Sequence, residues 1–296
     1  MKNRNRFSVL EPLRILTAAF CVQAPFSHTA LAQTSASSEA NLFHWAYAAS
    51  FGTGVYRIGD SEVFALHIPL SWQLRKSFVN ESNEWRLGVK ILFPITLSVQ
   101  NFDFSGGIPD LFPDRIEQWS FTPGVEIEVP VNSRWTLRAK SLFGWGTELG
   151  GGDESAWIYG ANLRSRFTFE PFKSGKLNLL NGFSWTGYTP NQGGDQSISR
   201  LMTGLELIYP AGLWKIGGQQ VYLKPHLVNY LYFNDVEFPF SQENQFTTLD
   251  SEWEVGLAVG KKGNFKIWKV EFDRAGVAFR FGDDFRGIRL LFRSVF

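Results

Sequence analysis

Histidines are the side chains of this 296-residue chain that most readily act as general bases near neutral pH. Beyond residue 32 there are three of them, His44, His67 and His226. Hydrolysis by such a base needs a nucleophile or an activated water held beside it. None of the three lies in a short motif with serine and asparagine or beside an aspartate, and His67 is flanked by Leu66 and Ile68. The sequence therefore predicts no catalytic residue, and a histidine-based hydrolase is the alternative.

Carboxylates and cysteine offer no recognisable site for a metal or a cofactor. Glu252 and Glu254 share one face of a predicted strand, where a pair of acidic residues usually forms a solvated wall. The single cysteine, Cys21, precedes residue 32, so the rest of the chain has neither a thiolate ligand nor a disulfide. The sequence has no metal-ligand spacing, phosphate-binding loop or nucleotide fingerprint. We expect no metal and no cofactor.

Charged residues recur at strand spacing and could line a polar interior. Lys90, Glu126 and Lys140 fall on three consecutive predicted strands, in the order basic, acidic, basic. Opposite charges on neighbouring strands can pair, which offsets the cost of confining them. The predicted interior charges are Arg86, Lys90, Glu126, Glu128, Arg138, Lys140, Arg164, Arg166 and Arg280. Two interpretations stay open: structural filling of the interior, or a constriction that passes small solutes and favours anions.

Alternation of apolar and polar residues indicates the elements that hold these charges. The clearest run is Trp85–Val99, in which eight successive alternate positions are apolar and Lys90 lies between two of them. Such a run is longer than the usual soluble strand of about five to six residues. Similar alternation predicts twelve strands, at 43–51, 64–72, 85–99, 119–131, 135–145, 157–169, 177–188, 200–209, 221–233, 253–259, 277–281 and 284–296.

The lengths of the connections predict how these strands are arranged. An even number of antiparallel strands, closed into a barrel, leaves both termini on the periplasmic side. The long segments 102–115, 189–196 and 234–248 then lie outside the cell, whereas the tight turn 131–134 and the connection 260–269 lie inside. The predicted fold class is all-β, a transmembrane antiparallel β-barrel of about 12 strands and of outer-membrane type.

The beginning of the chain is typical of an export signal. A basic start is followed by the short apolar run Ile15–Ala24 and by the small residues around Ala32. The apolar run has about ten residues, whereas a membrane-spanning helix needs about 20. We expect a signal peptide at 1–32 that is cleaved after Ala32, a short flexible segment at 33–42, and an outer-membrane β-barrel at 43–296.

Composition also favours a membrane barrel over a soluble sandwich. Aromatic residues make up 16% of the chain, and they bracket predicted strands, as Trp135 and Trp145 do. Membrane barrels carry aromatic girdles at both interfaces. A sandwich, the alternative, packs its apolar faces inward and has little need of tryptophan at strand ends. The formal net charge of +1 gives no support to nucleic-acid binding.

The end of the chain, Val270–Phe296, reads VEFDRAGVAFRFGDDFRGIRLLFRSVF. A strand containing glycine is followed by an acidic turn and by a closing strand that ends on phenylalanine. This order resembles the end of autotransporter-type translocator barrels, which also have twelve strands. Only about ten residues separate Ala32 from the first predicted strand, so we expect neither a passenger nor a pore helix. The chain therefore most resembles the solitary autotransporter-like outer-membrane barrels, in which the barrel stands alone.

This resemblance implies a location in the outer membrane of a Gram-negative bacterium, with outer-membrane lipid around the wall. Phe296 resembles the C-terminal sorting signal of such barrels, which implies the barrel-assembly machinery as a partner during insertion. The resemblance implies no catalytic residues. We expect a non-enzymatic barrel, either a small pore or a structural and surface-interaction protein. The alternative is an outer-membrane barrel enzyme that modifies lipids or peptides.

Overall fold

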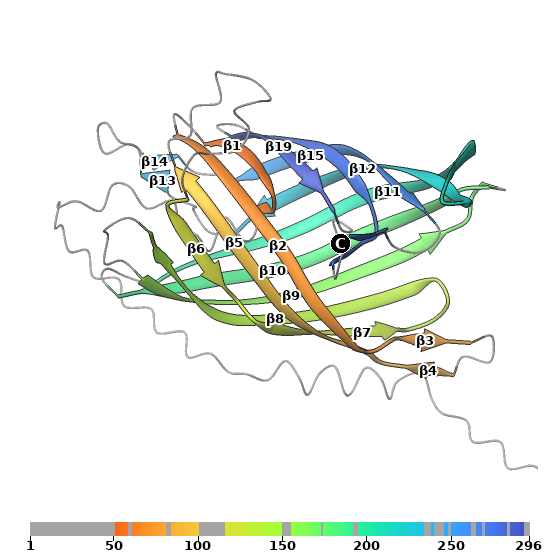
Figure 1. Cartoon of the computed structure of the whole chain (residues 1–296), viewed down its shortest axis with the longest axis horizontal. Coiled ribbons are helices and arrows are strands. Elements are labelled where there is room, and N and C mark those ends of the chain that lie inside the picture. The colour runs from red at the N-terminus through yellow and green to blue at the C-terminus, as the bar shows by residue number, and fades with distance from the viewer. Residues whose placement is uncertain are drawn as a thin grey trace, which may run out of the picture. The chain divides into compact units, whose positions relative to one another are not determined.

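The structure is a computed structural model of the whole chain (Figure 1). It describes residues 51–58, 61–80, 84–100, 116–149, 155–172, 174–191, 195–233, 238–239, 246–247, 250–261, 265–267, 270–282 and 285–292. The expected signal peptide, the segment 33–42, most of the first predicted strand and Phe296 lie outside these residues.

The described residues form one large antiparallel sheet that closes on itself (Figure 1). Its strands are β1 (Gly54–Ile58), β2 (Ser61–Arg75), β5 (Gly88–Gln100), β6 (Gln118–Phe121), β7 (Gly124–Pro130), β8 (Trp135–Glu148), β9 (Ser155–Phe169), β10 (Lys176–Pro190), β11 (Gln196–Ile216), β12 (Gln219–Tyr232), β15 (Ser251–Lys261), β18 (Ala275–Gly282) and β19 (Phe285–Leu291). Each strand pairs with its neighbours along the chain, β1 pairs with β19, and β2 pairs with β5, so no break remains in the circuit.

β6 and β7 together make one strand of the wall. Ile95 pairs with Phe121 and Leu92 pairs with Gly124, so the register against β5 continues unchanged across the break. The break falls at Thr122 and Pro123, because proline has no N–H to donate to the ladder. Counted in this way, the closed barrel has twelve strands, as the sequence predicts.

Three short hairpins lie outside the main sheet, and one of them corrects a predicted strand. β3 (Phe78–Val79) pairs with β4 (Trp85–Arg86), and this hairpin extends past the ends of β2 and β5 (Figure 1). The predicted strand 85–99 is therefore divided at Leu87, because Trp85 and Arg86 belong to the hairpin. The other two hairpins pair β13 (Phe238–Pro239) with β14 (Phe246–Thr247) and β16 (Phe265–Ile267) with β17 (Val270–Phe272).

The start of the barrel also differs from the prediction. Phe51, the described end of the predicted strand 43–51, is not in a strand, and the wall begins at Gly54. Gly52 has a φ of 88°, which glycine adopts without a steric penalty. A Cβ at Gly52 would also lie 2.9 Å from Arg289 Nε. The chain therefore bends inward just before β1, and Phe51 is fully buried in the lumen.

The two faces of the wall have opposite chemistry. Leu257 and Val277 are register partners on β15 and β18, and they are 52% and 51% exposed, whereas Ala258 and Ala278 beside them are buried. The same outward exposure of large apolar side chains occurs around the wall, at Trp72, Phe93, Phe121, Val125, Phe143, Trp157, Phe183, Leu205, Leu227, Leu257, Val277 and Ile288. The hydrophobic surface thus faces outward, and the polar side chains are enclosed.

The barrel has a long-connection end and a short-turn end. The first is named for the two longest connections, 101–117 and 233–250, although the two-residue connections 59–60 and 283–284 belong to it too. The second is named for the turns 131–134 and 217–218, although the longer connections 76–87 and 262–274 belong to it too. An apolar plug fills the lumen near the long-connection end; it consists of Phe51, Tyr56, Ile58, Val63, Ala65, Ala156, Ile158, Tyr188, Ile198 and Phe285. Apart from Phe51, which precedes β1, its members come from β1, β2 and β19 on one side and from β9, β10 and β11 on the opposite side. The plug therefore crosses the lumen.

Candidate functional site

Two carboxylates of β15 organise the charged side chains beside the plug. Glu254 accepts hydrogen bonds from Arg289 Nη1 at 2.9 Å and from the Tyr230 hydroxyl at 3.1 Å. Glu252 accepts a hydrogen bond from the Tyr232 hydroxyl. Both side chains are fully buried, so the expectation that this pair forms a solvated wall is wrong. The strand alternation gave the correct face for both residues but could not reveal that the lumen is packed at this level.

Arg280, one of the predicted interior charges, is fully buried against Glu252. Its guanidinium lies 5.0 Å from the ring centre of Phe51 and 4.7 Å from that of Tyr230. Aromatic faces attract a cation, and a buried charge needs such partners. Arg280 therefore joins the apolar plug to the carboxylates of β15 and has the geometry of a structural residue.

A second buried network lies across β10, β11 and the start of β18. Arg274 donates a hydrogen bond to Glu206, which also accepts one from Asn178 Nδ2 at 3.0 Å. Lys224 Nζ lies 3.9 Å from a carboxylate oxygen of Asp273. The cations of this side of the lumen are thus largely matched by nearby carboxylates.

On the other side, the predicted stripe brings basic and acidic side chains into contact. Lys90 Nζ lies 2.6 Å from Glu126 Oε1, and Arg138 Nε lies 2.5 Å from Glu128 Oε2. The register explains the first pair, because Lys90 and Lys140 are the two register partners of Glu126 on β5 and β8. Arg86 does not belong to this stripe, since it is exposed on the β3–β4 hairpin.

Arg164 and Arg166 lie on β9, next to this stripe. Arg164 is the register partner of Arg138, so two cations face each other across β8 and β9. Arg164 Nε is buried and has no hydrogen-bond partner among the described residues. β5, β7, β8 and β9 together place five cations in this region, Lys90, Arg138, Lys140, Arg164 and Arg166, against the two carboxylates Glu126 and Glu128. This side of the lumen carries an excess of positive charge.

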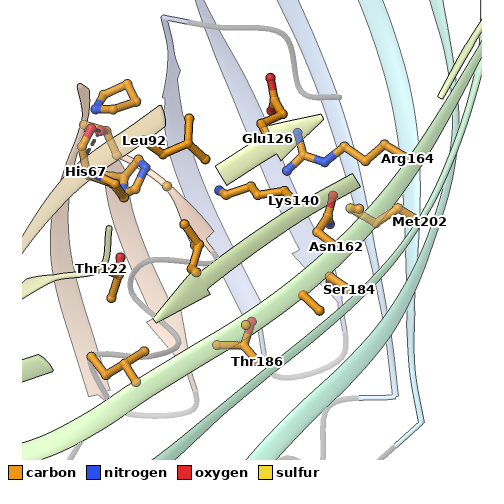
Figure 2. A pocket seen from close by; sticks show the side chains of 18 of the residues that line it. His67, Leu92, Thr122, Glu126, Lys140, Asn162, Arg164, Ser184, Thr186 and Met202 are labelled. Atoms are coloured by element: carbon orange, nitrogen blue, oxygen red, sulfur yellow. Dashed lines mark hydrogen bonds between the residues drawn. The ribbon is translucent and has the colours of Figure 1, made fainter. Parts of the chain in front are cut away.

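The excess positive charge borders a cavity of about 220 Å³ (Figure 2). Lys140 and Arg164 extend from β8 and β9 into the same part of this cavity, close to Glu126 (Figure 2). Arg200 and Arg289 line it from the opposite wall. Apolar side chains line it as well, among them Leu70, Leu92, Leu142, Ile158, Met202 and Leu291. The cavity therefore combines a cationic corner with an apolar wall.

A second cavity, of about 310 Å³, adjoins the first at Glu126, which lines both. Lys76 and Ser77, which follow β2, also line it, so it lies toward the short-turn end. Ser77 donates a hydrogen bond to Glu128, so this carboxylate is bound at the wall of the second cavity. The two cavities form a polar region that lies on the short-turn side of the apolar plug.

The two described histidines differ in their surroundings. His226 lies 3.0 Å from Glu254 through Nε2 and is buried with it. His67 lines the first cavity, and its Nδ1 lies 3.0 Å from the hydroxyl of Thr96. Thr96 is buried and does not line that cavity, so the hydroxyl is not presented to a substrate there. His44 lies outside the described residues.

No group of three or more His, Cys, Asp and Glu residues in the described ranges is arranged to hold a metal ion. In these ranges, no helix is both long and apolar enough to cross a membrane.

Several residues of the lumenal site were not among the predicted interior charges. Glu206, Arg274 and Tyr230 are buried there, and Arg289 and Tyr232 are partly buried beside them. A signal was present for the tyrosines, because they share a strand face with His226 at period two. The ion pairs gave no such signal, since their partners lie on strands that are distant in sequence.

Comparison with protein-family models and with curated protein sequences finds no match to this chain. The resemblance of Val270–Phe296 to solitary autotransporter-like barrels therefore stays a prediction from the sequence. The fold itself is a closed antiparallel β-barrel of twelve strands.

Proposed function

We propose that this chain is a non-enzymatic bacterial outer-membrane β-barrel with a closed lumen, which acts as a structural or surface-interaction protein. The observation that carries the proposal is the reversal of the usual faces: large apolar side chains are exposed around the wall while the charges are enclosed. Monomeric soluble proteins rarely expose continuous apolar surface on this scale. A closed barrel also satisfies every requirement for a spanning sheet, because it leaves no unpaired edge in lipid.

The two longest connections support one orientation in that membrane. Bacterial outer-membrane barrels have short periplasmic turns and longer extracellular loops. The turns 131–134 and 217–218 would then face the periplasm, and the connections 101–117 and 233–250 would face outward. Under this proposal the barrel-assembly machinery inserts the chain, and Phe296 serves as the sorting signal.

The apolar plug supports a closed barrel over an open pore. The rings of Phe51, Tyr56 and Phe285 pack in tilted contacts with centres 5.3 to 5.9 Å apart, and all three are fully buried. Water and ions do not cross a packed apolar layer, because they would lose their hydrogen bonds there. The plug makes a role at the surface or in the structure of the membrane more fitting than free diffusion of solutes.

Single-channel recording in a planar bilayer tests this proposal. We expect no conductance from the wild-type protein, once heat-modifiable gel mobility has shown it to be folded. The double variant Phe51→Ala with Phe285→Ala removes two rings of the plug and should show current steps. Phe279→Ala, which changes an outward phenylalanine that is 48% exposed, serves as the control and should stay silent. Stable steps from the wild-type protein would contradict the closed lumen.

A second candidate, a barrel enzyme that modifies lipids or peptides, draws on one observation. His67 lines the cavity and contacts a hydroxyl, that of Thr96. If this pair were catalytic, the folded protein would release fatty acid from phospholipid vesicles or cleave peptides, and His67→Ala would abolish that activity. We expect no such release from the wild-type protein, because Thr96 is buried and does not line the cavity.

A further inference from the structure

Three buried side-chain atoms that line the cavity of about 220 Å³ have no hydrogen-bond partner among the described residues. They are Thr122 Oγ1, Asn162 Oδ1 and Arg164 Nε. Asn162 and Arg164 both lie on β9, and Figure 2 shows their side chains together on one side of the cavity, with Thr122 apart from them. Buried polar atoms are normally satisfied by protein, water or a ligand. The cavity therefore contains a polar site that the described side chains do not satisfy.

The two atoms of β9 differ in what they can bind. Arg164 Nε carries a hydrogen and can only donate, whereas Asn162 Oδ1 can only accept. A hydroxyl group satisfies both through one oxygen, because it accepts one hydrogen bond and donates another. A carboxylate or an ether would leave Asn162 without a donor, and an ammonium group would leave Arg164 without an acceptor. The pair therefore favours a hydroxyl group on the ligand.

The rest of the cavity determines the body of the ligand. Leu92, Leu142 and Met202 line it beside these polar atoms. Filling the volume with water would take about seven molecules at about 30 Å³ each, and a buried water needs two to four polar partners, which an apolar wall does not supply. The volume is also smaller than the roughly 300 Å³ at which sites for drug-sized molecules begin. The fitting ligand is thus a small molecule with a hydroxyl group and an apolar body.

We propose that the lumenal cavity binds a small alcohol or phenol, whose hydroxyl group accepts a hydrogen bond from Arg164 Nε and donates one to Asn162 Oδ1, while its apolar body lies against Leu92, Leu142 and Met202. The adjoining cavity of about 310 Å³ meets the first at Glu126 and lies toward the short-turn end, so the ligand enters from that side. The site lies inside the wall, so the inference goes beyond the proposed membrane function and does not depend on it.

A methionine methyl group reports on this site directly. The chain has two methionines, Met1 and Met202, and Met202 is buried at the cavity. Isotope labelling of the methionine methyl groups, in the folded full chain in zwitterionic micelles, therefore places one NMR reporter in the site. The loss of its resonance in Met202→Leu assigns it.

Phenol is the probe, and fluorobenzene, which has nearly the same shape but no O–H donor, is the matched control. At equal free concentrations, we expect phenol to shift the Met202 resonance with at least tenfold higher affinity than fluorobenzene. Absence of a shift with phenol, equal affinities of the two compounds, or tighter binding of benzoate, which only accepts hydrogen bonds, would each overturn the proposal.

Variants locate the binding. Asn162→Leu and Arg164→Met each remove one partner of the hydroxyl group. Each should weaken phenol binding at least tenfold and leave fluorobenzene binding nearly unchanged, so that either variant decides the matter if the other fails to fold. Unchanged phenol binding in either folded variant would overturn the site.

Matched controls make the same changes away from the cavity. Asn181→Leu lies on β10 at a position that does not line the cavity, and Arg86→Met lies on the exposed β3–β4 hairpin. Both should leave phenol binding unchanged, and a tenfold loss in either would overturn the site. Bilayer insertion and conductance are measured separately, so failure here leaves the membrane proposal standing.

Discussion

Arg138 and Arg164 face each other as register partners on β8 and β9, yet only Arg138 has a carboxylate within ion-pair distance, that of Glu128. Like charges directly opposite each other destabilise a sheet. The lumen thus holds one cation in an ion pair with a carboxylate and a neighbouring cation that is not in such a pair. This imbalance separates the cavity side of the lumen from the side of β12, β15, β18 and β19, where the cations lie in ion pairs.

Replacement of Arg164 should therefore stabilise the empty barrel. Arg164→Gln removes the repulsion from Arg138 while it keeps a polar side chain in the cavity. We expect the free energy of unfolding to rise by up to about 1 kcal/mol, the upper range of cross-strand pair effects. Urea unfolding in lipid vesicles, in buffer without added alcohols, measures the change. A fall in stability would contradict the description of Arg164 as a cation outside any ion pair.

Replacement of Arg280 should have the opposite effect. Arg280→Met leaves Glu252 buried without its cation, and removal of one partner of a buried pair costs about 3–5 kcal/mol. The double variant Arg280→Met with Glu252→Gln should recover part of that loss, because no buried charge is then left alone. Urea unfolding of the single and double variants gives the coupling. A single variant as stable as the wild-type protein would show that the pair does not hold the lumen together.

Thr53 should hold the first strand in place through its side chain. Its hydroxyl donates to the His67 carbonyl and accepts from the His67 N–H, both at 3.0 Å. Thr53 lies between Gly52 and Gly54, where the chain enters the wall. Thr53→Val keeps the shape and removes both hydrogen bonds, so we expect a loss of about 1–3 kcal/mol in unfolding free energy. Thr203→Val, at an exposed position of β11, should change stability much less. Equal effects of the two substitutions would refute this role.

Alternation of residue types was enough to predict the twelve-strand barrel and the inward face of residues such as Glu126 and Arg280. It failed at the start of the wall, because Phe51 has the right spacing for a strand but the positive φ of Gly52 turns it inward. The alternation also placed Trp85 in the same strand as β5, because apolar residues alternate with a period of two both in the β3–β4 hairpin and in the strand that follows it. Pairs such as Arg274 with Glu206 depend on the diameter and packing of the lumen, which a period of two does not encode.

A charged residue on the outward face should destabilise the barrel. Val277→Arg places a cation on the apolar exterior of β18, where Val277 is 51% exposed. Arginine at the middle of a bilayer costs about 2–4 kcal/mol in membrane barrels, whereas the same exposed substitution in a soluble protein has little effect. Gln219→Arg, an exposed position beside the turn 217–218, is the control and should be nearly neutral. Unfolding in vesicles measures both, and equal stability of the two variants would count against a lipid-facing wall.

The most direct test of the membrane proposal is the environment of a spin label on the outward face. The label is attached at Leu257→Cys in a chain that also carries Cys21→Ser, after folding into vesicles, with Gln219→Cys as the water-exposed control. The proposal predicts that oxygen, which dissolves in lipid, collides often with the label at 257 and that a water-soluble nickel chelate does so rarely. If the chelate reaches position 257 as freely as position 219, the outward apolar surface does not lie in a membrane.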